Sequence, residues 1–192
     1  MSLRLRVIVG FAVVVGLLAV TSLIGVSQLG SLEDHEATIA RQEAPFIVDL
    51  QRAAIQSRDA NNDAAVILVI MVSNTLQEVV EKVTGTPAQT DPTSMNQYKA
   101  SYQENLDLAR ASFASARTFV EGEPDRLAAL DEMEAALTSW DETMQRLMTT
   151  YEQTGEFDNA LVEELNTKSA AYHKLVDDTI AAARTELDDA HD

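Results

Sequence analysis

Histidine is the side chain in this sequence best suited to metal or acid–base chemistry, and there are three: His35, His173 and His191. A di-iron site in a helical protein needs Glu-x-x-His on two helices and a glutamate from each of two others. Only Asp188 stands three positions before a histidine, and it has no counterpart elsewhere. The spacing therefore predicts no metal site and favours solvated surface histidines.

Other catalytic groups are equally poorly represented. The chain has no cysteine, which excludes disulfides, thiolate zinc sites, iron–sulfur clusters and a cysteine nucleophile. It contains no glycine-rich phosphate loop and no Gly-x-Ser-x-Gly motif. The carboxylates, such as Glu132 and Glu134, are spread along expected outer helix faces, with no apolar setting that would raise a pKa for acid catalysis. We predict that the chain is not an enzyme and uses no cofactor.

The charge balance narrows the possible partners. There are 31 Asp and Glu against 14 Lys and Arg, a formal net charge of −17, which argues against nucleic-acid binding. Four prolines, seven glycines and 5% aromatic residues favour long helices.

A membrane helix is predicted near the N-terminus. Residues 7–26 contain no charge, and twenty helical residues span about 30 Å, the thickness of a bilayer core. Arg4 and Arg6 precede this segment and the next basic residue is Arg41, so the positive-inside rule keeps the N-terminus in the cytoplasm. A cleaved signal peptide is the alternative, but its apolar region is shorter and ends in an A-x-A-like site. The residues after Val26 offer no such site.

The predicted organisation is thus a cytoplasmic start at 1–6, a helix across the inner membrane at 7–26, and a periplasmic or extracellular domain at 27–192. Helix-breaking residues stand at 84–94, in the turn Gly122 to Pro124, and at 153–158, where Asp158 suits an N-cap. They divide the domain into four helical segments, about 27–83, 96–121, 124–153 and 158–192.

Apolar residues at alternating spacings of three and four mark one face of each later segment. In the second these are Tyr98, Tyr102, Leu106, Ala109, Phe113, Ala116 and Val120. In the third they are Leu130, Met133, Leu137, Trp140, Met144, Leu147 and Tyr151. In the fourth they are Leu161, Leu165, Ser169, Tyr172, Val176, Ile180, Ala183 and Leu187. The pattern predicts an all-α fold: an antiparallel up-down-up-down four-helix bundle, with a long first helix continuous with the membrane helix.

Segment lengths predict how the helices line up. The first segment is about twice as long as the second and third, so we expect the four-helix part to lie level with 59–83 and a two-helix stalk to contain Pro45. The fourth segment ends too early to reach the membrane beside the first, so we expect the chain to be truncated before a second membrane helix.

Residues 64–72, AAVILVIMV, are apolar on all sides. A helix that is apolar all round must be buried all round, so one face is expected in its own bundle and the other against a second chain. We predict a homodimer through the first helix, with Val66, Ile67, Val69 and Ile70 at the interface. A central core strand or a second membrane segment is the alternative, and nine residues are too short to span.

Three stretches carry a resemblance to a known family. MSLRLRVIVGFAVVVGLLAV looks like a short basic start and first membrane helix, and SQLGSLEDHEATIARQEAPFIVDLQRA like the helix that leaves the membrane. LMTTYEQTGEFDNALVEELNTKSAAYHKLVDD is similar to a turn into a last bundle helix. The chain resembles the N-terminal half of bacterial methyl-accepting chemotaxis proteins with a four-helix-bundle ligand-binding domain.

This resemblance implies signal transduction in chemotaxis. A homodimeric periplasmic sensor would bind a small-molecule ligand or a periplasmic binding protein and pass a helix shift to the cytoplasm. Histidine kinases and diguanylate cyclases carry similar sensor bundles. A membrane-anchored structural or interaction bundle is the alternative from another class.

A ligand site is expected between facing helices. Matching heights along antiparallel helices places Asn74 and Gln77 level with Asn166 and Lys168, and Lys168 would hold a carboxylate ligand. Solvent-facing spacers are the alternative reading of all four, and Arg110 and Arg146 are other cationic candidates at a similar height.

Overall fold

The computed structural model of the chain describes residues 42–85 and 92–189, which hold four α-helices and no strand. The helices are α2 (Ala44–Thr84), α3 (Pro92–Phe119), α4 (Pro124–Thr154) and α5 (Asn159–Asp189). The all-α prediction is confirmed for this part of the chain. The predicted membrane helix at 7–26, and its continuity with the first bundle helix, lie outside the described residues.

Helix boundaries follow local chemistry. Gly85 and Gly155 end α2 and α4 in the left-handed conformation, with φ of 70° and 67°, and their N–H groups donate to Glu81 and Tyr151 carbonyls at 2.8 Å. Glycine adopts this conformation without the steric cost that a Cβ would add. Asp158 is the N-cap of α5, since its Oδ1 accepts from the Ala160 and Leu161 N–H groups at 2.9 and 3.2 Å.

Two prolines lie where helices begin. Pro45 is in the first turn of α2, where its missing N–H leaves no hydrogen bond unmade. Pro92 is the first residue of α3, so the predicted start at 96 is four residues late. The expectation that Pro92 to Ser94 belong to a loop was wrong, because proline is well suited to the first position of a helix.

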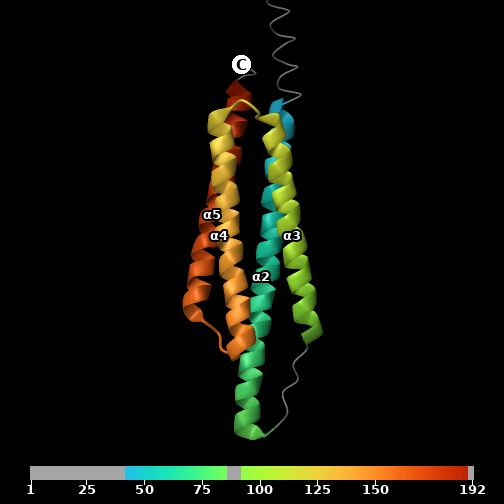
Figure 1. The fold of residues 1–192 in the computed structure, drawn as a ribbon, viewed down its shortest axis with the longest axis vertical. Helices are drawn as coiled ribbons and strands as arrows, with labels where there is room; N and C mark the ends of the chain where they lie inside the picture. Colours follow the sequence, from blue (N-terminus) through green and yellow to red (C-terminus); the bar gives the residue numbers. More distant parts are fainter. Residues whose placement is uncertain (1–41, 86–91, 190–192) are drawn as a thin grey trace, which may run out of the picture. The chain divides into compact units, whose positions relative to one another are not determined.

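The four helices lie lengthwise against one another and enclose one hydrophobic core (Figure 1). The main contacts are between the pairs α2·α3, α3·α4, α4·α5 and α2·α5. The α3–α4 connection lies at the end where α2 begins, and the α4–α5 connection lies toward the other end (Figure 1).

The seams predicted from the sequence form this core. Every predicted seam residue of α4 from Leu130 to Leu147 is 0% exposed, and Tyr151 is half-buried. The seam residues of α3 from Tyr102 to Ala116, and Val120 just after the helix, are 0% exposed, and those of α5 from Leu161 to Ala183 are at most 8% exposed. Burial at this periodicity explains why the three helices pack along these faces.

The expected level of the four-helix part was wrong. It was predicted to begin at residue 59 of the first helix, yet Phe46 is 2% exposed and lies under Arg126 of α4. The guanidinium of Arg126 also lies 3.8 Å from the carboxylate of Glu43. The bundle therefore includes the very start of α2, and Pro45 is part of it rather than of a two-helix stalk.

The surplus length of α2 lies at its other end. α2 has 41 residues, whereas α4 and α5 have 31 each. At about 1.5 Å per residue the difference is about 15 Å. Since α2 and α4 begin together, the last turns of α2 extend past the end of α4 (Figure 1).

Candidate functional site

The four residues predicted to bind a ligand are not brought together. The Ser169 hydroxyl of α5 donates to the Asn61 side chain of α2 at 2.8 Å, which places neighbouring Lys168 level with about residue 62. Asn74 is therefore about twelve residues, or about 18 Å, farther along α2. Glu78 instead lies near Gly155, with a carboxylate oxygen 4.0 Å from where a Cβ would stand. The prediction that these residues lie level with one another was wrong, because the end of α2 extends past the end of α4.

Lys168 already has a full set of partners. Its ammonium lies 2.7 Å from the Glu164 carboxylate and donates to the Thr143 hydroxyl at 2.9 Å and the Ser139 carbonyl at 3.4 Å. The hydrogen bonds from Lys168 and Thr143 lower the pKa of Glu164. Since an ammonium has three hydrogens to donate, this arrangement ties α5 to α4 and leaves none for a ligand carboxylate.

The other predicted polar residues are scattered. Asn166 is exposed and Asn74 is half-buried. Gln77 is also half-buried, and its Oε1 is enclosed with no hydrogen-bond partner among the described residues. Of the alternative cations, Arg110 is ion-paired with Asp141 at 2.7 Å, whereas Arg146 is 60% exposed.

His173 is not a solvated surface residue. The centre of its ring lies 5.2 Å from the ring centre of Tyr172 and 6.1 Å from that of Trp140. The Tyr172 and Trp140 rings stack on each other with their centres 6.1 Å apart. Burial lowers the pKa of His173, and nearby Arg58 lowers it further. His35 and His191 lie outside the described residues. No group of three or more potential metal-binding side chains occurs within the described ranges.

The predicted dimer residues fall on different faces of α2. Ile67 is 0% exposed and belongs to the core of its own bundle, so its assignment to an interface was wrong. Val66 and Ile70 are half-buried, and Ile70 packs against that core. Val69 is 67% exposed. The apolar stretch 64–72 thus does have one face in its own bundle and another that is exposed.

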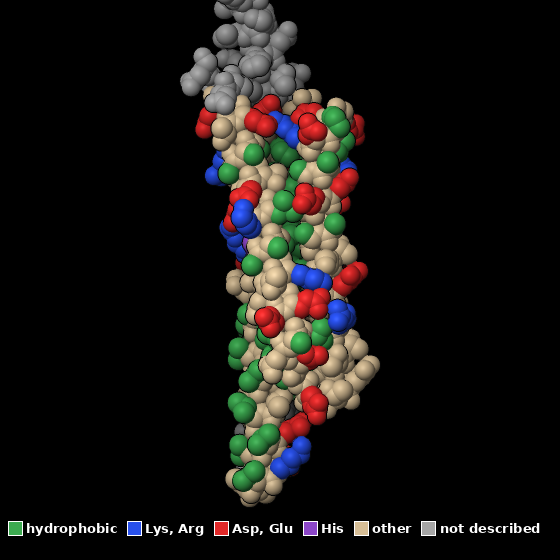
Figure 2. Space-filling model, turned by 90° about the vertical axis from the view of Figure 1, so that its left-hand side faces the viewer, with side chains coloured by type: hydrophobic (Ala, Val, Ile, Leu, Met, Phe, Trp, Pro, Cys, Tyr) green, Lys and Arg blue, Asp and Glu red, His purple; other side chains and the backbone are tan. Residues whose placement is uncertain are grey.

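The exposed face continues well beyond that stretch, as a line of apolar residues that we name the α2 seam. Its members are Val69, Val72, Leu76, Val79 and Val83, which are 39–79% exposed. Their steps alternate between three and four residues, the spacing of a coiled-coil contact. Figure 2 shows hydrophobic side chains gathered along one edge of the lower half of the molecule, over the projecting end of α2.

The seam also extends toward the start of α2. Counting back by sevens from Val69 reaches Asn62, Ile55 and Val48, all of them exposed, with Ile55 at 58% and Val48 at 50%. The residue type at every seventh position from 48 to 83 is therefore Val, Ile, Asn, Val, Leu, Val. A single Asn at such a position fixes register in coiled coils. The sequence contains this seven-residue repeat, but residues 64–72 are apolar on all sides and do not show which of their faces the repeat follows.

By length and composition, one helix of the described residues, α2, is apolar enough to cross a membrane. Only 17% of its apolar window is buried inside the structure. However, α2 also makes polar contacts with its neighbours: Asp63 accepts hydrogen bonds from Ser101 and Asn105 of α3 at 2.8 and 2.9 Å. These contacts, with the Asn61 bond to α5, make α2 a member of the bundle.

Comparison with known proteins gives no match: no family model, no curated protein and no solved structure is significantly similar to the chain.

Proposed function

We propose that the chain is the sensor part of a chemoreceptor-like transmembrane protein: an extracytoplasmic, antiparallel up-down-up-down bundle anchored in the inner membrane by residues 7–26. Ligand binding shifts a bundle helix, and the shift passes through the membrane. The single observation that carries this proposal is the two-faced α2, which joins the core on one side and presents the α2 seam on the other.

Homodimerisation of this sensor occurs through the α2 seam. Two copies pack their α2 helices in parallel, so that each seam residue faces its own equivalent. Val and Ile at some positions and Leu at others suit a two-stranded contact, and a pair of Asn62 side chains fixes the register. Covering this row removes large apolar side chains from water, at roughly 25 cal/mol per Å² of apolar surface. The interface is therefore displaced from the residue set expected from the sequence, because Ile67 is already in the core.

Cysteine crosslinking tests the dimer directly, because the chain has no cysteine of its own. Leu76→Cys places one thiol in the seam, and Leu108→Cys places one on α3 at a similarly solvent-exposed apolar position, 61% and 43% exposed respectively. In the full chain in lipid nanodiscs, mild oxidation should give a disulfide-linked dimer for Leu76→Cys only. Equal crosslinking of both variants would contradict the seam.

Ligand sensing is tested by a thermal-unfolding screen of the full chain with amino acids, organic acids and amines. Trp140 is the single tryptophan and is fully buried, so its fluorescence reports loss of the core. A ligand at a hundred times its Kd stabilises by about 2.7 kcal/mol, which raises the Tm of a chain of this size by about 5–10 °C. A flat response across the panel would count against direct small-molecule sensing and favour a structural or interaction role.

A further inference from the structure

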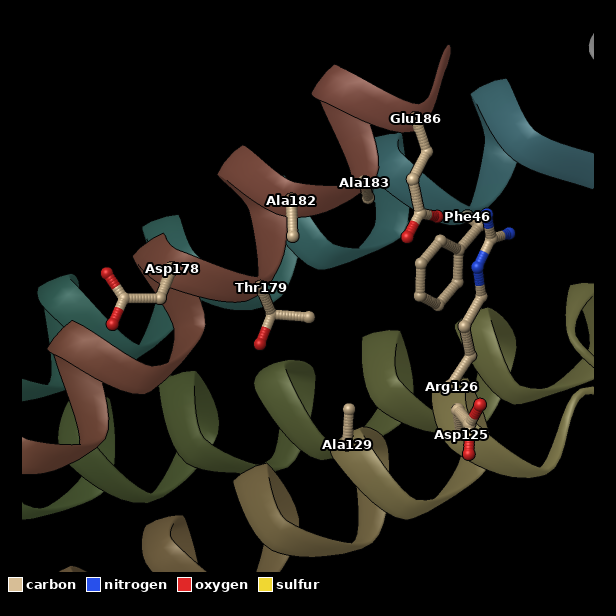
Figure 3. A pocket seen from close by; sticks show the side chains of 9 residues that line it. All are labelled: Phe46, Asp125, Arg126, Ala129, Asp178, Thr179, Ala182, Ala183 and Glu186. Atoms are coloured by element: carbon tan, nitrogen blue, oxygen red, sulfur yellow. Dashed lines mark hydrogen bonds and ion pairs between the residues drawn. The ribbon is translucent and has the colours of Figure 1, made fainter. Parts of the chain in front are cut away.

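A hollow of about 340 Å³ lies beside the start of α4 and the end of α5, within the size range of small-molecule sites (Figure 3). Small residues create it: Ala129 of α4 faces Ala182 and Ala183 of α5. Phe46 of α2 also borders the hollow, but only 2% of it is exposed because Arg126 lies over its ring, so the three alanines form most of the apolar surface. The apolar part of a ligand can lie against this surface, where it is removed from water.

One end of the hollow is closed by Arg126. Its guanidinium lies 5.4 Å from the centre of the Phe46 ring and 2.7 Å from the Glu186 carboxylate (Figure 3). It also lies 3.1 Å from Glu123 and 3.8 Å from Glu43. Three carboxylates therefore surround the single positive charge of Arg126 and more than neutralise it. An anionic ligand would be repelled by them.

The remaining charge at the rim is negative. Asp125 of α4 and Asp178 of α5 stand at opposite ends of the hollow, Asp125 beside Arg126 and Asp178 at the far end (Figure 3). Asp178 is paired with Lys174, but both side chains are more than 60% exposed, so this pair is weak and easily exchanged. Asp125 makes no ion pair with any described residue. An apolar floor beneath a surplus of carboxylates is complementary to a cation that carries an apolar body.

We propose that this hollow binds a small organic amine, with its hydrocarbon or aromatic body against Ala129, Ala182 and Ala183 and its ammonium group at the end where Asp178 stands (Figure 3). The other end of the hollow already shows this pairing of a cation with an apolar surface and carboxylates, since the Arg126 guanidinium lies over Phe46 and beside Glu186. The identification of the ligand class rests on the proposed sensing function. The site is far from the residues expected to bind a ligand, and it involves the start of α2 and the end of α5.

Isothermal titration of the full chain in zwitterionic nanodiscs tests the site, with benzylamine as probe and empty nanodiscs as reference. Benzyl alcohol has the same ring without the charge, and benzoate has the opposite charge. An ion pair with an exposed carboxylate is weak, so benzylamine should bind about two- to fivefold more tightly than benzyl alcohol. Benzoate should bind more weakly than either.

Two matched pairs of variants locate the binding. Ala182→Leu fills the hollow, whereas Ala181→Leu adds the same side chain at the adjacent exposed position, which does not line it. Asp178→Asn removes a rim charge, whereas Asp188→Asn removes an exposed charge elsewhere on α5. We expect Ala182→Leu to abolish benzylamine binding and Asp178→Asn to weaken it severalfold, with both controls unchanged.

Absence of benzylamine binding, equal affinity for benzyl alcohol, or undiminished binding by Ala182→Leu would each overturn the proposed site. None of these results would overturn the sensing function if another compound in the thermal screen stabilises the chain. A flat thermal screen together with benzylamine binding at the hollow would retain the site and overturn the sensing function for the compounds in that panel.

Discussion

Two neighbouring substitutions in α2, Ile67→Ala and Val69→Ala, should have sharply different effects on stability. Ile67 is 0% exposed and Val69 is 67% exposed. Truncation of a buried isoleucine to alanine costs about 2–5 kcal/mol, from lost burial and from the cavity left behind. For a chain of this size, about 3 kcal/mol corresponds to a fall in Tm of about 6–12 °C. Val69→Ala should change the stability of a single chain by less than about 0.5 kcal/mol, since alanine is also the better helix former.

The assay is thermal unfolding of the full chain in mild detergent, followed by the fluorescence of Trp140. Measurements at the lowest usable protein concentration separate the stability of one chain from that of an assembly, because only the latter depends on concentration. Val69→Ala should reduce the concentration dependence of Tm, whereas Ile67→Ala should lower Tm at every concentration. A similar loss at both positions at low concentration, or a harmless Ile67→Ala, would refute the assignment of these residues to core and seam.

Three further outcomes follow from local geometry. His173→Phe should reduce the loss of stability between pH 8 and pH 5.5. Burial, and after it Arg58, lower the pKa of His173 in the folded chain, whereas in the unfolded chain the histidine pKa is about 6.5. As the pH falls, the unfolded state therefore takes up the proton first, which destabilises the fold. Urea unfolding of both proteins at each pH measures this, and equal pH dependence would exclude His173 as the cause. Gly155→Ala should cost about 1–2 kcal/mol in thermal unfolding, because φ is 67° there while no atom lies closer than 4.0 Å to the added carbon; an unchanged Tm would contradict this cost. Tyr102→Phe should cost about 1 kcal/mol in urea unfolding, since it removes a 3.2 Å hydrogen bond to Asp141 but leaves that carboxylate its other partners; a loss above about 3 kcal/mol would mean that the ring itself had been displaced.

Local patterns in the sequence predict most of the core. The side chains of Trp140, Leu106 and Val176 recur at the spacing that keeps one helix face away from water, and each is at most 1% exposed. Asp158 is an N-cap because its short side chain reaches the free N–H groups of its own helix. Such features depend on neighbours within one or two turns, which a sequence displays directly.

The candidate sites depend on contacts between helices. The hollow beside Phe46 exists because Ala129 and Ala183, 54 positions apart in the sequence, reach the same level of the bundle. No periodicity within α4 or α5 alone indicates that meeting. Likewise, Lys168 donates hydrogen bonds to residues of α4, and no pattern within α5 indicates that its ammonium group has these partners.

The sequence by itself determined that the chain is helical, where most helices begin and end, and which faces of α3, α4 and α5 form the core. These properties follow from residue spacing and backbone preference, which act over a few residues. Only the tertiary structure decided the level at which the helices meet, and hence that Ile67 is core, that Val69 is exposed and that Asn74 lies far from Lys168. Sliding a helix by whole heptads preserves its apolar face, so the pattern along one helix leaves that level open, and contacts among all four helices select it.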